Sequence, residues 1–347
     1  MSNILYLGQS STSSSSGHRA RALGRLGHNV IISDPYKAFE KQLKSRWMGP
    51  LHFRSGYRLL TSAINRWMEE VVKENNPDLV WVNSGELFGP ATMNTLKRLG
   101  RPIVLYNNDD PTGGRDGHRF DLLLKSLQYY DLAVVMREVN VDEYKKNGAQ
   151  RVIREFMSYD EEFHRPFSSI SEVPQKFRSE VAFIGTWMRY EKRDEFLLEL
   201  IQQGIPVSIW GNRWEKSPHF AKLKSHWRGN ALAGRDYVSA LQGAKICLGL
   251  LSKGNRDMHT MRSLETPFAG GLICAERTPE HQEMYKEGVE AVFWSDAREC
   301  AEVCKRLLAD DDERESIRLA GMKRVLSLKA GNEDVCRRVL ENLKVEI

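Results

Sequence analysis

Residues 259–294 read HTMRSLETPFAGGLICAERTPEHQEMYKEGVEAVFW, and this stretch decides the fold class. Its first part has a helical pattern over 259–269 that ends at a pair of glycines, and the apolar run GLICA follows at 271–275. A second apolar run, AVFW, lies at 291–294. Short apolar runs separated by helical patterns predict the buried strands of a parallel sheet, because parallel strands need a long crossover connection.

The same alternation extends back to the N-terminus. Strands are expected at 4–7, 29–33, 78–82, 102–106, 131–136, 180–185, 206–211 and 245–251. Helical patterns lie between them at 18–27, 58–74, 90–100, 118–128, 191–203 and 236–243. The pattern lapses between Phe156 and Arg178, in a stretch with two prolines and several serines, which we interpret as an interdomain connection.

The sequence therefore predicts an α/β protein with two tandem Rossmann-like, doubly wound domains that face a cleft. The first domain is expected at 1–165 and the second at 180–330. A C-terminal helix within 331–347 is placed to pack back on the first domain. The length of 347 residues agrees with two domains at about 150 residues each.

Composition and charge exclude several classes of protein. Hydrophobic residues make up 41% of the chain and charged residues 28%, which excludes a wholly disordered or collagen-like chain. The net charge of +5 is too small to indicate nucleic-acid binding, and we expect no nucleic-acid partner. No run approaches the roughly 18 apolar residues of a membrane-spanning helix, and the N-terminus lacks the pattern of a signal peptide. We therefore expect a cytoplasmic protein.

The five cysteines are odd in number and all lie in the second half of the chain. They are Cys247, Cys274, Cys300, Cys304 and Cys336. Cys300 and Cys304 are four residues apart in a helical pattern, unlike the paired C-x2-C of a zinc site. We interpret the cysteines as reduced structural thiols, and we expect neither a metal site nor a resident cofactor.

The loop after the first expected strand, GQSSTSSSSGHRARALG (8–24), lacks the G-x-G-x-x-G of a dinucleotide site. Gly17 and His18 open the helix that follows, and a second Gly-His pair stands at 27–28. Two interpretations stay open. Gly17 lets a substrate approach while His18 supplies polar chemistry, or the pair is an ordinary N-cap turn with a solvated histidine.

These Gly-His pairs, together with Arg262 and Glu265 in the 259–294 stretch, resemble GT-B glycosyltransferases of the group-1 superfamily, especially the branch with CgeB-like spore-maturation proteins. The resemblance implies that Glu265 accepts hydrogen bonds from the donor ribose. It also implies that the helix with Arg262 and Thr266 faces the donor diphosphate with its N-terminus, where anions are stabilised. Asp257 stands where many retaining members have a glutamate, which departs from the family pattern.

Two upstream stretches agree with this donor site. Gly185, Thr186 and Trp187 follow the expected strand 180–185, and Arg193 begins the next helix, so backbone N–H groups and a cation are available to a diphosphate. In VSIWGNRW (207–214), Gly211 and the tryptophans lie where the family places the nucleotide base. Trp210 and Trp214 either wall the base or are plain core residues.

Acidic residues follow two strands of the first domain. Glu86 comes after the third strand, and Asp109, Asp110 and His118 lie in the glycine-rich stretch after the fourth. A carboxylate here could deprotonate an acceptor hydroxyl, so Asp110 and His18 are the candidate catalytic residues, and Gly17, Glu86, Asp109 and His118 the candidate acceptor-binding ones. Turn capping by the aspartates is the alternative, and a metal site is the least expected one.

Residues 37–58, KAFEKQLKSRWMGPLHFRSGYR, carry six Lys or Arg and a single Glu, with aromatic and aliphatic residues between them. This composition suits an anionic membrane surface or an anionic polymer, or it describes a solvated loop whose aromatics pack on the domain. The resemblance implies a metal-independent glycosyltransferase of the hexosyltransferase type. Its donor would be a nucleoside-diphosphate sugar, most often UDP-linked, and its acceptor a hydroxyl of a glycan, a lipid-linked molecule or a small molecule.

The stereochemical outcome stays open. An inverting enzyme would use His18 or Asp110 as general base, whereas in a retaining enzyme the leaving phosphate itself can take the acceptor proton. Two other functions are kept as alternatives. One is a sugar-nucleotide epimerase or dehydrogenase with two Rossmann-like domains, and the other is a non-catalytic module that binds a nucleotide sugar.

Overall fold

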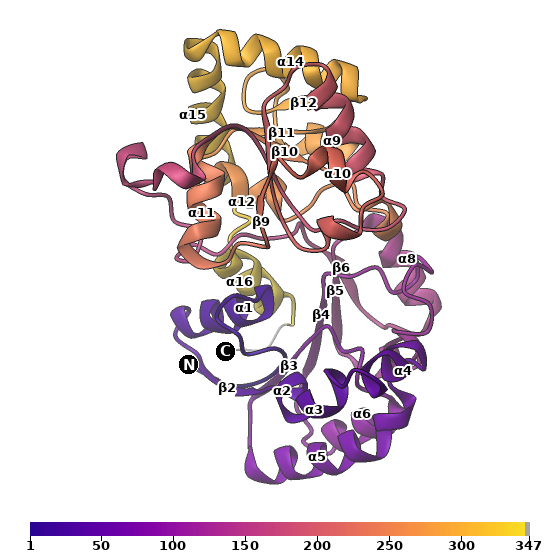
Figure 1. Ribbon diagram of the computed structural model, residues 1–347. Helices are drawn as coiled ribbons and strands as arrows, with labels where there is room; N and C mark the ends of the chain where they lie inside the picture. The colour runs from indigo at the N-terminus through magenta and orange to yellow at the C-terminus, as the bar shows by residue number, and fades with distance from the viewer. Residues whose placement is uncertain (344–347) are drawn as a thin grey trace. The chain divides into compact units, whose positions relative to one another are not determined.

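The computed structural model describes residues 1–343, and the chain forms two compact units (Figure 1). The first domain comprises Met1–Phe156 together with the helix that begins at Asn332, and the second comprises Met157–Gly331. The last four residues of the predicted segment 331–347 lie outside the described part of the chain. Each domain contains one six-stranded, fully parallel sheet, so the predicted pair of doubly wound α/β domains is confirmed.

The sheet of the first domain has the strand order β2-β1-β3-β4-β5-β6. Its strands are β1 (Asn3–Leu7), β2 (Asn29–Ser33), β3 (Leu79–Asn83), β4 (Ile103–Asn107), β5 (Leu132–Val135) and β6 (Val152–Arg154). β1, β3, β4 and β5 are almost wholly buried, because helices cover both faces of a parallel sheet. The sequence pattern missed β6, a three-residue edge strand that is only half buried and therefore has no continuous apolar run.

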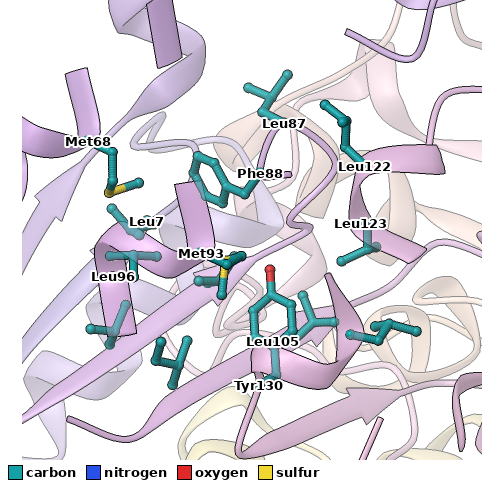
Figure 2. Packing of buried hydrophobic residues seen from close by; sticks show 14 of the residues in the cluster. Leu7, Met68, Leu87, Phe88, Met93, Leu96, Leu105, Leu122, Leu123 and Tyr130 are labelled. Atoms are coloured by element: carbon teal, nitrogen blue, oxygen red, sulfur yellow. The ribbon is translucent and has the colours of Figure 1, made fainter. Parts of the chain in front are cut away.

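Helices cover both faces of this sheet. They are α1 (Ser15–Arg25), α2 (Pro35–Ala38), α3 (Glu40–Leu43), α4 (Met48–Arg54), α5 (Thr61–Glu74), α6 (Pro90–Lys97), α7 (Asp121–Leu124), α8 (Glu138–Lys146) and α16 (Asn332–Asn342). Figure 2 shows the core on one face, where Met68 of α5 and Met93 of α6 meet Leu7 and Leu105 of the sheet. On the other face the last described helix, α16, packs beside α1 (Figure 1).

The sheet of the second domain has the order β12-β11-β10-β7-β8-β9, so the direction of winding reverses between β7 and β10. Its strands are β7 (Ser179–Ile184), β8 (Val207–Trp210), β9 (Trp227–Gly229), β10 (Ala244–Gly249), β11 (Ile273–Glu276) and β12 (Val292–Trp294). Its helices are α9 (Arg193–Gln202), α10 (Phe220–Leu223), α11 (Gly234–Gly243), α12 (Arg262–Phe268), α13 (Pro279–Met284), α14 (Ala297–Ala309) and α15 (Asp311–Ser327). Ligands of open α/β sheets bind at such a reversal, beyond the carboxyl ends of the strands.

Three segments differ locally from the sequence pattern. The helix expected from 259 begins at Arg262, and the helical pattern at 118–128 is divided between α7 and a short turn. Residues 37–58 are not a loop but include the second half of α2 and all of α3 and α4. Helices this short are marginal on their own, so tertiary packing decides whether they form, and periodicity does not reveal them.

Candidate functional site

The first domain presents its candidate residues at the carboxyl ends of β1, β3 and β4. Helix α1 begins there, because the Ser14 Oγ accepts a hydrogen bond from the Gly17 backbone N–H at 3.0 Å. A Cβ on Gly17 would lie 2.1 Å from the Ser11 carbonyl oxygen, so glycine is required where the loop crosses the helix. The space beside Gly17 is therefore filled by the loop itself, which favours the N-cap turn over substrate approach at this position.

His18 is buried beneath the same loop. Its Nε2 lies 3.0 Å from the Thr12 carbonyl oxygen. A carbonyl can only accept, so Nε2 carries a proton and donates it to Thr12. His18 is thus a positioned imidazole and not the solvated histidine of the alternative interpretation.

The sequence analysis missed a buried cation, Arg19, next to His18. Its guanidinium lies 3.6 Å from the centroid of the Tyr106 ring, and Nη1 donates to the Asn83 Oδ1 at 2.7 Å. Tyr6 donates to the same oxygen at 3.1 Å. Asn83, the last residue of β3, is thus bonded to Tyr6 of β1 and to Arg19 of α1, and Arg19 also contacts Tyr106 of β4. These contacts fix the end of β3, which leads to Glu86. An arginine in a helix gives no sequence signal of such burial.

Glu86 is the centre of an acidic cluster. Ser84 and Gly85 both have a left-handed backbone, with φ of 80° and 76°, which turns the chain sharply after β3 and points Glu86 inward. The Glu86 carboxylate is only 3% exposed and accepts from Arg119 Nη2 at 2.9 Å. Burial raises the pKa of this carboxyl.

Arg119 also joins the Asp109 and Asp116 carboxylates to this cluster, at 3.3 and 3.1 Å. The Arg119 guanidinium thus pairs with three carboxylates, and the acidic cluster has many hydrogen-bond acceptors. The sequence analysis assigned Glu86 and Asp109 but not Arg119, which lies 33 residues from Glu86 along the chain. A pairing over that separation is decided only by tertiary structure.

Asp110 is held by helix α8. Its Oδ1 accepts from the Asn140 Nδ2 at 2.8 Å and from the Thr112 hydroxyl at 3.3 Å, and its side chain is buried. Asp109, by contrast, is partly exposed, and its backbone N–H donates to Asn107 in an Asx turn. His118 does not join these groups: it is 71% exposed and its Nδ1 pairs with Asp121 at 3.0 Å.

In the second domain, hydrogen bonds link the turn after β7 to the turn after β8. The Trp214 indole N–H donates to the Gly185 carbonyl oxygen at 2.9 Å. The backbone N–H of Trp187 donates to the backbone carbonyl of Asn212 at 3.0 Å. A Cβ on Gly211, whose φ is 152°, would lie 2.0 Å from the same Gly185 oxygen. Trp210 and Trp214 are both buried in the domain core, which favours the core interpretation over a wall for the base.

Arg193 ties together the two strands at which the winding reverses. Its Nη1 donates to the Thr186 carbonyl after β7 at 2.9 Å, and its Nη2 donates to the Leu251 carbonyl after β10 at 3.1 Å. The buried guanidinium therefore brings a positive charge to the point where an α/β sheet binds its ligand. Arg193 is also among the residues that line a cavity of about 270 Å³ beside β10–β12.

Glu191 was missed by the sequence analysis. Its carboxylate accepts from the backbone N–H groups of Lys253 at 2.9 Å and Gly254 at 3.2 Å. Successive N–H groups that converge on one carboxylate form an anion-binding turn. This turn after β10 therefore already holds an anion supplied by the chain itself.

Helix α12 carries the strongest candidates. The Glu265 carboxylate is only 9% exposed and accepts from the Tyr237 hydroxyl at 2.5 Å, and His164 Nε2 lies 3.5 Å from its other oxygen. His164 Nδ1 accepts the Asp160 backbone N–H at 2.8 Å, so Nε2 is the protonated nitrogen that faces Glu265. Burial, and then the neighbouring Glu265 charge, raise the pKa of Tyr237. Glu265 is therefore oriented by donors from α11 and from the 156–178 connection.

Arg262 lies one turn before Glu265 on α12. Its buried Nε has no hydrogen-bond partner within residues 1–343. Asp257 is buried in the loop before the helix, and its backbone N–H donates to the Ser252 carbonyl at 3.3 Å. Thr266 has a packing role, because a Cβ on Gly271 would lie 3.0 Å from its methyl group. The helix thus presents one cation and one anion, and Thr266 supports it.

A buried polar network holds the loop before α12. The His259 Nδ1 is bonded to Glu280, and its Nε2 accepts the Met157 backbone N–H at 2.9 Å. His281 donates through Nδ1 to the Glu276 carbonyl at 2.7 Å and accepts the Ser263 hydroxyl at Nε2, also at 2.7 Å. Burial lowers the pKa of His281 to about 4, so this ring is neutral near pH 7.

Part of the second domain matches a known protein family. Residues 191–332 match a family model described as Glycosyl transferase-like, a span that includes Arg193, Asp257, Arg262 and Glu265. A search of curated protein sequences finds no match.

Solved structures match over nearly the whole chain. Sucrose-phosphate synthase from Thermosynechococcus elongatus is 12% identical, with a TM-score of 0.70 and coverage of 99% of this chain and 98% of the other. HepE from Anabaena, solved in complex with UDP-glucose, is 13% identical, with a TM-score of 0.71 and 99% coverage of both chains. A Listeria monocytogenes protein described as a UDP-N-acetylglucosamine 2-epimerase is 12% identical, with a TM-score of 0.60 and coverage of 99% and 95%. The chain therefore has the GT-B glycosyltransferase fold, as the resemblance predicted. The narrower CgeB-like branch stays a prediction.

Proposed function

We propose that this protein transfers a sugar from a nucleoside-diphosphate sugar, with UDP as the nucleotide, to a hydroxyl acceptor without a metal ion. The observation that carries the proposal is the pair Arg262 and Glu265 on one turn of α12, inside the segment that matches the glycosyl transferase-like family. UDP is favoured because HepE, of the same fold, was solved with UDP-glucose.

The donor residues have complementary tasks. Glu265, oriented by Tyr237 and His164, accepts hydrogen bonds from the two ribose hydroxyls. Arg262 and Arg193 supply positive charge to the diphosphate, where negative charge grows as the sugar–phosphate bond breaks. With two arginines for this charge, the chemistry requires no divalent cation.

In the transfer step the acceptor oxygen bonds to the anomeric carbon, the bond from that carbon to the phosphate oxygen breaks, and the nucleoside diphosphate leaves with the bonding electrons. The acceptor proton goes to His18 or to the Asp110 carboxylate in an inverting enzyme, or to the leaving phosphate in a retaining one. The cluster of Glu86, Asp109 and Arg119 is assigned to acceptor hydroxyls, because its carboxylates are acceptors on a buried strand end.

Calorimetry with UDP and UDP-sugars tests the donor assignment. Glu265→Gln is expected to weaken donor binding by roughly 1–3 kcal/mol, because the amide accepts only at one atom and leaves a ribose hydroxyl poorly paired. Glu302→Gln is the matched control, since Glu302 is an exposed residue of α14. Equal donor affinity in Glu265→Gln and wild type would overturn the assignment. Stabilisation by NAD(P) without any by sugar nucleotides would favour the epimerase or dehydrogenase alternative.

We propose, second, that the basic-apolar segment (37–58) docks on an anionic lipid surface. Trp47 is 81% exposed, and Met48, Leu51 and Phe53 of α4 are exposed beside it. Exposed cations lie among them, at Lys37, Lys41, Lys44, Arg46, Arg54 and Arg58. Apolar side chains that enter an interface, ringed by cations, suit a bilayer of anionic lipid better than a soluble polymer. No helix within residues 1–343 is long and apolar enough to cross a membrane.

Co-sedimentation with phosphatidylglycerol-containing and pure phosphatidylcholine vesicles tests the docking. Binding is expected only to the anionic vesicles, and Arg46→Ala should weaken it by about 1 kcal/mol, close to fivefold. Trp47→Ser should weaken it further at high salt, where the apolar contribution dominates. Binding to polyphosphate that Trp47→Ser leaves unchanged, without vesicle binding, would instead indicate an anionic polymer.

A further inference from the structure

Three of the five cysteines meet in the core of the second domain. Cys274 lies on β11, and Cys300 and Cys304 lie one turn apart on α14. Their three Sγ atoms are all within 4.8 Å of one another, and each residue is fully buried. The i, i+4 spacing puts two thiols on the face of α14 that meets the sheet, and the strand supplies the third.

The surroundings of the three thiols are apolar. The three cysteines belong to the buried hydrophobic core of the second domain, which also includes Val292, Trp294, Ala297, Ala301 and Leu307. The nearby Trp294 indole N–H donates to the Cys274 carbonyl oxygen at 3.4 Å and so to backbone, not to sulfur. Glu299, beside Cys300 in the sequence, is paired with Arg277 at 2.6 Å, so this pair adds no net positive charge. An ion bound by these thiols must therefore form a complex with little net charge, because an uncompensated charge in such a core is very costly.

This requirement selects the kind of ion. Three thiolates around a divalent cation leave one net negative charge, and around copper(I) they leave two. Around a trivalent centre they leave none. Thiolates are soft ligands that prefer soft, thiophilic ions. A trivalent thiophilic centre with three-fold coordination, such as arsenic(III), satisfies both conditions.

We propose that Cys274, Cys300 and Cys304 form a three-thiolate binding site for arsenic(III). Arsenous acid, As(OH)₃, exchanges its three As–O bonds for three As–S bonds. Each thiol proton leaves with a hydroxide as water, so three waters are released and no oxidation state changes. The product is neutral and joins β11 covalently to α14.

This site is independent of the proposed glycosyl transfer, and sugar-nucleotide binding is not needed to test it.

The experiment uses the reduced full-length protein and sodium arsenite. After gel filtration, elemental analysis is expected to give one arsenic per chain, X-ray absorption three sulfur neighbours, and thermal unfolding a higher midpoint. Cys274→Ala, Cys300→Ala and Cys304→Ala should each weaken binding by about 100-fold or more, because each removes a bond made at high effective concentration. Cys247→Ala and Cys336→Ala are matched controls, since both are buried cysteines outside the cluster, and they should bind like wild type.

The coordination measured on the wild-type protein does not depend on any variant being folded. Two sulfur neighbours instead of three, or no retained arsenic after prolonged incubation, would overturn the proposal and leave the cysteines as packing residues. If Cys247→Ala weakens arsenic binding as much as the variants of Cys274, Cys300 and Cys304 do, the proposal is overturned as well. Each variant is compared with wild type in thermal unfolding without arsenite, so that loss of folding is separated from loss of binding.

Discussion

The carboxyl edges of the two sheets differ in which groups they present. In the first domain the strand ends carry carboxylates, and a single guanidinium, that of Arg119, serves three of them. In the second domain the arginine at the strand ends, Arg193, is bonded to backbone carbonyls, and Arg262 is the cation of α12. The first edge therefore gathers three carboxylates around Arg119, whereas the second presents Arg193 and Arg262 beside the carboxylate of Glu265. The same architecture is suited to a hydroxyl acceptor in one domain and an anionic donor in the other.

The largest expected effect concerns the proposed base in the first domain. Asp110→Asn and His18→Ala are expected to leave donor affinity unchanged, while turnover falls by about 10²–10⁴-fold in the variant that lacks the base. Steady-state kinetics with saturating donor, together with calorimetry, separates the two effects. If both variants lose donor affinity and keep turnover, the division of tasks between the domains is wrong.

Removal of Arg119 tests the acidic cluster. Arg119→Met is expected to lower the free energy of unfolding by about 3 kcal/mol at pH 7, because it leaves Glu86 buried and unpaired. The loss should be smaller at pH 5. The pKa of Glu86 is raised in the folded state, so its protonation at lower pH removes the buried charge.

Denaturant unfolding at both pH values measures this effect. Arg66→Met is the control, since Arg66 is an exposed residue of α5. A destabilisation of Arg119→Met that does not change with pH would show that Glu86 is not the group left uncompensated.

The buried, neutral His281 of the second domain predicts that the network before α12 is sensitive to acid. The pKa of His281 falls from 6.5 to about 4 on folding, so between these values the unfolded state binds more protons. Stability is then fully present above pH 6.5 and is lost as the pH falls, by about 3 kcal/mol at most. Unfolding of His281→Asn should show a shallower pH dependence from pH 6.5 to 4, and His219→Asn, a partly exposed control, should follow wild type.

The smallest expected effect is that of Trp214→Phe, which tests whether Trp214 is a core residue or a wall of the nucleotide-base site. Trp214→Phe removes the hydrogen bond to the Gly185 carbonyl and should cost about 1 kcal/mol of stability. Its effect on donor affinity, measured by calorimetry, should be less than threefold, because Trp214 is a core residue. A larger loss of donor affinity than of stability would restore Trp214 as a residue that walls the nucleotide base.

Much of the fold was predictable because buried parallel strands are short apolar runs. Ten of the twelve strands carry that signal, and the two without it, β6 and β9, are three-residue edge strands that are only partly buried. In the candidate site, Glu265, Arg262 and Asp110 were predictable from their places after strands or in a family-like motif. Tyr237, His164 and Arg119, which orient or pair with candidate residues, were not, because their partners lie 28, 101 and 33 residues away along the chain.

The sequence by itself determined the alternation of strands and helices and the types of residue at the strand ends. These follow from local properties, namely apolar runs, helical periodicity and glycine at tight turns. Only the tertiary structure decided which groups pair. It placed three carboxylates on one arginine, left Gly17 and Trp214 in packing roles, and gathered Cys274 with Cys300 and Cys304. The physical reason is that a side chain's neighbours, and hence its charge state, depend on contacts between segments that are distant in the sequence.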